Sequence, residues 1–280
     1  MIGADETSPA RSGSMEGLLM KTIRIAAVAV AALLAAAGVA QAQQKEWKEV
    51  RVGTEGAYPP FNNLNAKGEL EGFEIDYVNA LCANMKIKCT WVAQDWDGII
   101  PALLSGKYDI IAAGMNATDE RKKKVDFTAV YTRTPISVIA AKTVTSTDVS
   151  PAALKGKAVG AQSSTVHANY LEKFYSGSSV KLYPTQEEAN LDLKNGRLDY
   201  IVADQLSLED FINGQGKDCC KFVGEVKRDP AIHGPGVGMA VRKEDTALRD
   251  MFSKAIEASL KDGTHKKIAD KYFKINIMAD

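Results

Sequence analysis

The chain has 280 residues, with 35 basic and 35 acidic residues and a hydrophobic content of 45%. A neutral chain without a long basic block gives no support for binding to nucleic acid or to an anionic membrane surface. Four cysteines without a CxxC pair and three scattered histidines argue against a zinc site, so we expect no metal ion and no cofactor.

The N-terminal 42 residues have the features of an export leader. A short basic segment, Met20–Arg24, precedes an apolar, alanine-rich run over residues 25–39, and Ala40 and Ala42 supply small residues two apart. This order predicts a secretory signal peptide that is cleaved after Ala42. The apolar run is shorter than the roughly 20 residues that span a bilayer, which argues against a membrane anchor. Residues 1–19 are polar and unpatterned, and we interpret them as an upstream extension, with Met20 as the natural start.

The exported part, residues 43–280, is long enough for one large or two small domains. Its first stretch predicts strand, helix, strand, helix and strand in turn, at residues 48–54, 73–85, 88–92, 99–104 and 109–112. Strands that alternate with helices are typical of an α/β unit with a parallel sheet. An extended apolar run at residues 134–141 ends this first unit.

A second α/β unit follows. It predicts strands at residues 157–161, 181–183 and 198–203, and helices that end near residue 175, span 185–195 and span 206–213. The second of these helices begins at Thr185 and Glu188, which have the spacing of a capping box. A glycine-rich extended segment at residues 234–241 and two helices, at 246–261 and 264–272, complete the chain. We therefore predict two α/β units joined by two extended segments.

The residues suited to binding follow predicted strands. Ligands of open parallel sheets bind beyond the carboxyl ends of the strands. The residues at these places comprise one arginine, two carboxylates, two aromatic rings and several small or hydroxyl side chains: Glu55, Tyr58, Trp96, Ala113–Arg121, Ser163–Thr165 and Asp204. Thr118 or Asp119 can cap a helical turn on which Arg121 falls. Ordinary alternatives exist, because Arg121 could lie on a solvated turn, Asp204 could only cap the helix at Gln205, and the two aromatic residues could belong to the core.

The cysteines fall into two pairs. Cys82 and Cys89 lie at the end of one predicted helix and the start of the next strand, within reach of a disulfide that export would permit. Cys219 and Cys220 are adjacent, and the sequence is compatible both with free thiols and with a bond between them.

Taken together, these motifs resemble the polar amino-acid-binding proteins of ABC importers, especially the lysine/arginine/ornithine- and histidine-binding periplasmic proteins. The resemblance covers essentially all of residues 43–280, and its markers are Gly53–Phe61, Gly72–Asp76, Cys89–Val92, Trp96–Leu103, Thr118–Arg121, Gly156–Gly160, Gly196–Asp199 and Gly263–Tyr272.

The resemblance implies an α/β fold of the type II periplasmic binding class, with two lobes that each carry a mostly parallel sheet and are joined by two crossover strands. Lobe I would comprise residues 43–134 and 236–280, and lobe II residues 135–235. The protein would be a periplasmic monomer that closes over its ligand and meets an inner-membrane ABC permease. Cys82 and Cys89 fall where relatives carry a disulfide.

The resemblance also implies roles for single residues. Arg121 would bind the ligand α-carboxylate with help from the backbone N–H groups of Asn116 and Thr165. Asp204 would bind the α-ammonium group, helped by the carbonyl of Gly114. The complete expected set is Glu55, Tyr58, Trp96, Ala113, Gly114, Asn116, Arg121, Ala161, Thr165 and Asp204.

The remaining roles concern the ligand side chain. Tyr58 and Trp96 would sandwich it, and Glu55 would meet a distal positive group. These roles favour arginine, with lysine, ornithine or histidine as the other basic amino acids, because a planar guanidinium suits both a stack and a carboxylate.

Two departures leave alternatives open. Ala113–Asn116 stands where relatives with small ligands often have a serine-rich run, and Val166 stands where basic-amino-acid binders often carry glutamine. Similar small residues occur in opine-binding relatives, although the extra carboxylate of an opine would meet Asp204. The fold also includes a periplasmic cyclohexadienyl dehydratase, in which Arg121 would hold the substrate and Glu55 or Asp204 would transfer the proton.

Overall fold

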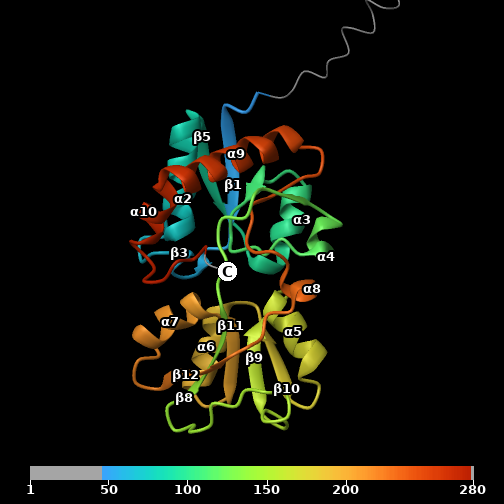
Figure 1. Ribbon diagram of the computed structural model, residues 1–280, viewed down its shortest axis with the longest axis vertical. Helices are drawn as coiled ribbons and strands as arrows, with labels where there is room; N and C mark the ends of the chain where they lie inside the picture. Colours follow the sequence, from blue (N-terminus) through green and yellow to red (C-terminus); the bar gives the residue numbers. More distant parts are fainter. Residues whose placement is uncertain (1–45, 279–280) are drawn as a thin grey trace, which may run out of the picture. The chain divides into compact units, whose positions relative to one another are not determined.

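The computed structural model describes residues 46–278, and the predicted extension and signal peptide lie outside this range. The described chain forms two five-stranded sheets and one small three-stranded sheet. Figure 1 shows helices α2, α3, α9 and α10 around the first large sheet and α5, α6 and α7 around the second. None of the helices in residues 46–278 is both long enough and apolar enough to cross a membrane.

The first sheet has the strand order β5-β1-β6-β13-β7. Strand β1 pairs in parallel with β5 and β6, whereas β13 runs antiparallel to β6 and β7. Strand β13 follows every strand of the second sheet in the sequence, so the first sheet is made from two separate segments of the chain. The bounds of its strands are β1 Glu49–Thr54, β5 Lys88–Ala93, β6 Ile110–Ile111, β7 Asp126–Phe127 and β13 Ala240–Val241.

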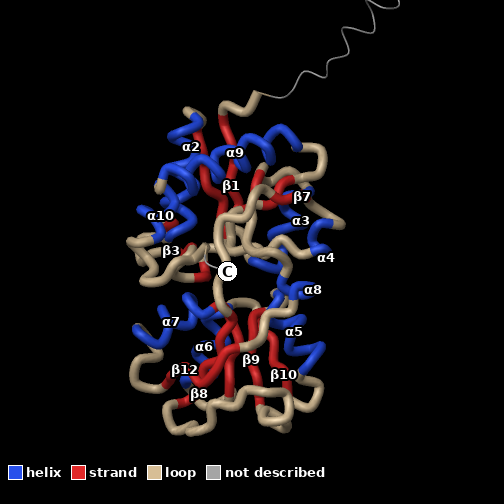
Figure 2. Tube along the Cα trace, in the orientation of Figure 1, coloured by secondary structure: helices blue, strands red, loops and turns tan. Residues whose placement is uncertain are grey.

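The larger helices around the first sheet are α2 (Phe73–Met85), α3 (Ile99–Leu104), α9 (Thr246–Asp262) and α10 (Thr264–Ala269), drawn in blue in Figure 2. Helix α9 buries Leu248, Phe252, Ile256 and Ser259, which recur every three or four residues and so form one face of the helix. That face packs against α2 and α10, and the core beneath contains a cluster of aromatic rings that includes Phe73.

The second sheet has the strand order β10-β9-β11-β8-β12. Strands β9, β10 and β11 are parallel, and β8 is antiparallel to both of its neighbours. The bounds are β8 Ile136–Ala141, β9 Ala158–Gln162, β10 Ser179–Tyr183, β11 Tyr200–Asp204 and β12 Cys220–Glu225. The helices are α5 Val166–Phe174, α6 Gln186–Lys194, α7 Gln205–Asn213 and α8 Pro230–His233. Helix α6 carries the predicted capping box of Thr185 and Glu188.

The chain passes between the two large sheets twice, once from β7 to β8 and once from β12 to β13. The first passage agrees with the predicted extended run. The second is less regular than expected, because within residues 234–241 only Ala240–Val241 forms a strand, and Gly234 and Gly236 adopt positive φ angles of 62° and 140°. Such angles interrupt a strand, and glycine tolerates them best.

Several short elements carry no periodic signal and were not predicted. They are the three-stranded sheet of β2 (Ala57–Tyr58), β3 (Asn62–Leu64) and β4 (Leu70–Glu71), strands β7 and β12, helix α8 and the 3-10 turn η1 (Trp96–Gly98). Helix α4 (Asp119–Lys122), in contrast, is the helical turn expected to carry Arg121. Strands of two or three residues are too short to show an alternation of polar and apolar side chains. Strand β12 has six residues, but its sequence CKFVGE does not alternate regularly. Helix α10 also ends at Ala269, three residues earlier than predicted.

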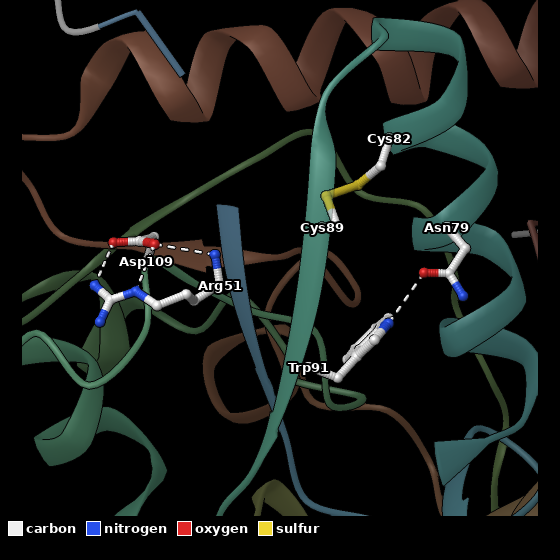
Figure 3. The surroundings of a disulfide bond; sticks show 6 residues. All are labelled: Arg51, Asn79, Cys82, Cys89, Trp91 and Asp109. Atoms are coloured by element: carbon white, nitrogen blue, oxygen red, sulfur yellow. Dashed lines mark hydrogen bonds and ion pairs between the residues drawn. A yellow bond between two sulfur atoms is a disulfide. The ribbon is translucent and has the colours of Figure 1, made fainter. Parts of the chain in front are cut away.

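Both cysteine pairs are bonded. Figure 3 shows Cys82 on α2 joined to Cys89 on β5, with the indole of Trp91 donating a hydrogen bond to Asn79 below the disulfide. The disulfide therefore ties the end of a helix to the edge strand of the first sheet. Cys219 and Cys220 also form a disulfide, which was one of the two states left open by the sequence.

Candidate functional site

One cavity is lined by residues that lie at or after the ends of strands in both large sheets. Seven of the lining residues come before β8 in the sequence: Glu55, Tyr58, Trp96, Ala113, Gly114, Asn116 and Arg121. The other five come after β8: Gln162, Thr165, Val166, His167 and Asp204. Nine of the ten expected residues are present. The tenth, Ala161, does not line the cavity, because its side chain is buried within β9 in the core of the second sheet.

The cavity lies where strands end, which explains how residues far apart in the sequence meet. Glu55 follows the last residue of β1, and Asp204 is the last residue of β11. Gln162, Val166 and His167 were absent from the expected set, although they belong to the same turn as Thr165 at the end of β9. The strand-end rule therefore could have found them.

Arg121 contributes a cation whose hydrogen bonds go to backbone carbonyls. Thr118 caps helix α4 by accepting a hydrogen bond from the N–H of Arg121, as the sequence suggested. The guanidinium donates to the carbonyls of Asn116 and Ser164, each at 3.0 Å, and its central carbon lies 5.1 Å from the centre of the Trp96 ring. Burial lowers the pKa of Arg121 to about 10, so it stays positively charged at neutral pH. These two hydrogen bonds use only some of the N–H groups of the guanidinium, so the others can donate to an anion.

Asp204 contributes an anion. It occupies the N-cap position of α7, but its side chain makes no capping hydrogen bond. The hydroxyl of Tyr58 donates to Oδ2 at 2.9 Å, the hydroxyl of Thr134 donates to Oδ1, and Nε2 of His167 lies 3.7 Å from Oδ1. Burial acts to raise the pKa of Asp204, yet His167 and the two hydroxyl donors hold it below its usual value. The capping alternative is therefore not what this side chain does here.

Glu55 lines the same cavity and is only 8% exposed. One of its oxygens accepts a hydrogen bond of 2.6 Å from Nε2 of Gln162, so the last residue of β9 contacts the residue that follows β1. Burial raises the pKa of Glu55 to about 7, and the nearby carboxylates of Asp95, Asp97 and Glu74 act in the same direction. A cation placed beside Glu55 would favour its charged form.

Tyr58 and Trp96 supply the aromatic walls. Both line the cavity, at 7% and 8% exposure. The hydroxyl of Tyr58 donates to Asp204 at the end of β11, and the indole N–H of Trp96 donates to the carbonyl of Ser164, in the turn after β9, at 3.3 Å. They are therefore wall residues of the cavity as well as part of the interior. The cavity therefore combines a positive group next to Asn116, two carboxylates and two aromatic rings.

Comparison with known proteins agrees with this geometry. Residues 50–275 match the bacterial extracellular solute-binding proteins, family 3. The chain is 43% identical to the L-arginine-binding protein of Pseudomonas aeruginosa, over 82% of this chain and 90% of that protein. It is 33% identical to the octopine-binding periplasmic protein of Rhizobium meliloti, over 91% of this chain and 99% of that protein.

A solved structure described as an ancestral arginine-binding protein bound to arginine superimposes with a TM-score of 0.74 and 37% identity, covering 81% of this chain and 98% of that one. The architecture of two mixed α/β sheets with flanking helices is that of the type II periplasmic binding fold, as the sequence predicted. The chain therefore belongs to family 3 of the bacterial extracellular solute-binding proteins.

Proposed function

We propose that this protein captures a basic amino acid, with arginine as the favoured ligand, in the periplasm and delivers it to an ABC permease of the inner membrane. One observation carries the proposal: a single cavity is lined by a guanidinium with donors to spare and by two buried carboxylates, Asp204 and Glu55. A basic amino acid has one anionic and two cationic groups, so its charges are complementary to these three.

The α-amino and α-carboxylate groups of the ligand would be bound by Asp204 and Arg121, which both line the cavity. Arg121 offers a planar fork that suits a carboxylate, and the backbone N–H groups of Asn116 and Thr165 would assist. Asp204 would bind the α-ammonium with the carbonyl of Gly114. Since His167 and two hydroxyl groups keep Asp204 ionised, an ammonium group would find a charged partner already in place.

The side chain would extend between Tyr58 and Trp96 toward Glu55. A delocalised cation on an aromatic face contributes about 0.5–2 kcal/mol, depending on how far it is desolvated. The guanidinium of arginine can stack on a ring and present two N–H groups to a carboxylate at the same time, which an ammonium group cannot do equally well. The arginine-binding relatives support this choice.

We also propose that lobe I comprises residues 43–134 and 236–280 and lobe II residues 135–235, that the lobes close around the ligand, and that the protein acts as a monomer after cleavage of the signal peptide behind Ala42. The contacts from Glu55, Tyr58 and Trp96 to the second sheet support closure, since they span the cavity. The closed form would be the one that the permease recognises.

An opine is the second candidate ligand, because the octopine-binding relative aligns over nearly its whole length. Octopine carries an additional carboxylate on the α-nitrogen of arginine. That carboxylate would lie against Asp204, and two like charges at this distance repel each other. We therefore place arginine ahead of octopine, and binding ahead of catalysis.

Isothermal titration calorimetry of residues 43–280 with all twenty amino acids, ornithine, citrulline and octopine tests the proposal. We expect the tightest binding for arginine and much weaker binding for citrulline, which has nearly the same shape but no side-chain charge. Tighter binding of octopine than of arginine would favour the second candidate. Absence of heat with every basic amino acid, or turnover of prephenate or arogenate, would contradict the proposed function.

A further inference from the structure

Glu74 is a buried charged residue that does not line the cavity, yet it is bonded to the loops that do. It is the second residue of helix α2 and is 0% exposed. Leaving a carboxylate in the interior is costly unless hydrogen bonds compensate for the lost water. Here three groups donate to it, and they come from three separate segments of the chain.

The first donor belongs to the loop that carries Ala113 and Asn116. The backbone N–H of Gly114 donates to Oε1 of Glu74 at 2.7 Å. Gly114 has a φ angle of 59°, a left-handed conformation that glycine adopts without steric cost but does not hold by itself, because it is equally free to leave it. The bond to Glu74 removes that freedom.

The second donor reaches the loop of Glu55 through an intermediate. Nδ2 of Asn62 donates to Oε2 of Glu74 at 2.7 Å, and Oδ1 of Asn62 accepts the N–H of Gly56 at 2.8 Å. Gly56 directly follows Glu55 and is also left-handed, with a φ angle of 77°. Asn62 is 0% exposed, so water does not replace these bonds.

The third donor is the hydroxyl of Tyr131, which also donates a hydrogen bond to Oε1 of Glu74. Tyr131 lies in the passage from β7 to β8, three residues before Thr134, whose hydroxyl donates a hydrogen bond to Asp204. All three partners of Glu74 donate, which is the bonding pattern of a carboxylate that accepts on both oxygens. One anion thus joins two ligand loops and the connection between the sheets.

We propose that Glu74 is a positioning residue for the ligand site: its carboxylate fixes Gly114 directly and Gly56 through Asn62, so that both loops of the first sheet hold their binding geometry before the ligand arrives. The inference rests on the proposed function for its ligand, but not for the state of the loops, which exists without ligand. Preorganised groups bind more tightly because less ordering is left to occur on binding.

A charge-swap pair of variants tests this. In Glu74→Gln, one carboxylate oxygen becomes an NH₂ group, which then faces a group that itself donates, such as Nδ2 of Asn62. In Asn62→Asp, the new carboxylate faces the carboxylate of Glu74. In the double variant, the new glutamine can donate to the new aspartate, and the aspartate can still accept the N–H of Gly56. The double variant therefore restores every hydrogen bond. Glu257→Gln, on the exposed face of α9, is the matched control.

Two measurements are needed on folded protein, with folding checked by circular dichroism. Amide hydrogen exchange without ligand should be at least tenfold faster at Gly56 and Gly114 in each single variant, and within about threefold of wild type in the double variant and the control. Calorimetry should show arginine binding at least tenfold weaker in each single variant, which corresponds to about 1.4 kcal/mol, with recovery in the double variant.

Wild-type exchange and wild-type arginine affinity in a folded Glu74→Gln variant would overturn the inference. If the single variants do not fold, the double variant decides. Recovery of folding, slow amide exchange and arginine binding in the double variant supports the inference. A double variant that is unfolded, or that exchanges rapidly at Gly56 and Gly114, contradicts it. Should the wild type bind no basic amino acid, the proposed function fails, whereas the exchange experiment still tests Glu74.

Discussion

The pKa of Glu55 predicts that arginine binding weakens in mild acid. In the arrangement of this structure, burial raises this pKa to about 7, so before arginine enters such a site about half of the molecules near neutral pH carry a protonated, uncharged Glu55. Only the ionised form attracts a guanidinium. A proton must therefore leave before the ligand binds fully, and the apparent dissociation constant rises as the pH falls below 7.

The size of the effect follows from the same pKa. The dissociation constant should increase by the factor 1 + 10^(7 − pH), which is close to 1 at pH 8, about 11 at pH 6 and about 100 at pH 5. A guanidinium about 4 Å from Glu55 at an effective dielectric constant of about 20 stabilises the ionised form by about 4 kcal/mol, or about three pKa units. The pKa in the complex is then about 4, below which the loss of affinity levels off. Asp204, whose pKa is held below its usual value, stays ionised throughout.

Calorimetric titrations of arginine between pH 5 and pH 8 measure this dependence. The matched control is Glu55→Gln, which keeps the size of the side chain and can retain a hydrogen bond to Gln162, but does not titrate. We expect this variant to bind arginine more weakly at pH 8 and to lose most of the pH dependence. A wild-type dissociation constant that changes less than threefold between pH 8 and pH 5, or an equally steep dependence in the variant, would refute the reasoning.

Three further predictions concern single groups. Asp204→Asn should raise the dissociation constant for arginine by about 30-fold or more, because a charged hydrogen bond contributes about 2–3 kcal/mol. An unchanged dissociation constant in calorimetry would show that Asp204 does not bind the α-ammonium group. Arg121→Lys keeps the charge but not the planar fork, so arginine binding should weaken by at least about tenfold; wild-type affinity would show that the fork is not used. Replacing Cys82 and Cys89 together by serine should lower the free energy of unfolding in urea by about 2–3 kcal/mol, the loop-closure value for a separation of seven residues, while leaving arginine affinity within about twofold. Equal urea midpoints under oxidising and reducing conditions would contradict that last prediction.

Much of the fold could be read from local patterns. The alternation of strands and helices, the capping box at Thr185 and the helix that begins at Phe73 depend on neighbours within a few residues, and the structure confirms them. The position of Arg121 after the cap at Thr118 is of the same kind. Residues at strand ends were also recognisable, because parallel sheets bring these ends together.

Other features could not be found in this way. Strands of two or three residues, such as β13, exist only because a neighbouring strand offers hydrogen-bonding groups, and β13 pairs with β6 from more than 120 residues earlier in the chain. The bond between Cys219 and Cys220 was equally undetermined, since adjacent thiols are compatible with either state.

The sequence by itself therefore determined the α/β class, the order of the long elements and the residue types that surround the cavity, because each of these depends on short-range periodicity and capping. Only the tertiary structure decided that Asp204 faces Tyr58 and Thr134 instead of capping α7, that Gln162 meets Glu55, and that Glu74 accepts three donors. The reason is physical: a buried polar group must find partners, and in a chain that crosses twice between two sheets those partners come from segments that no local pattern connects.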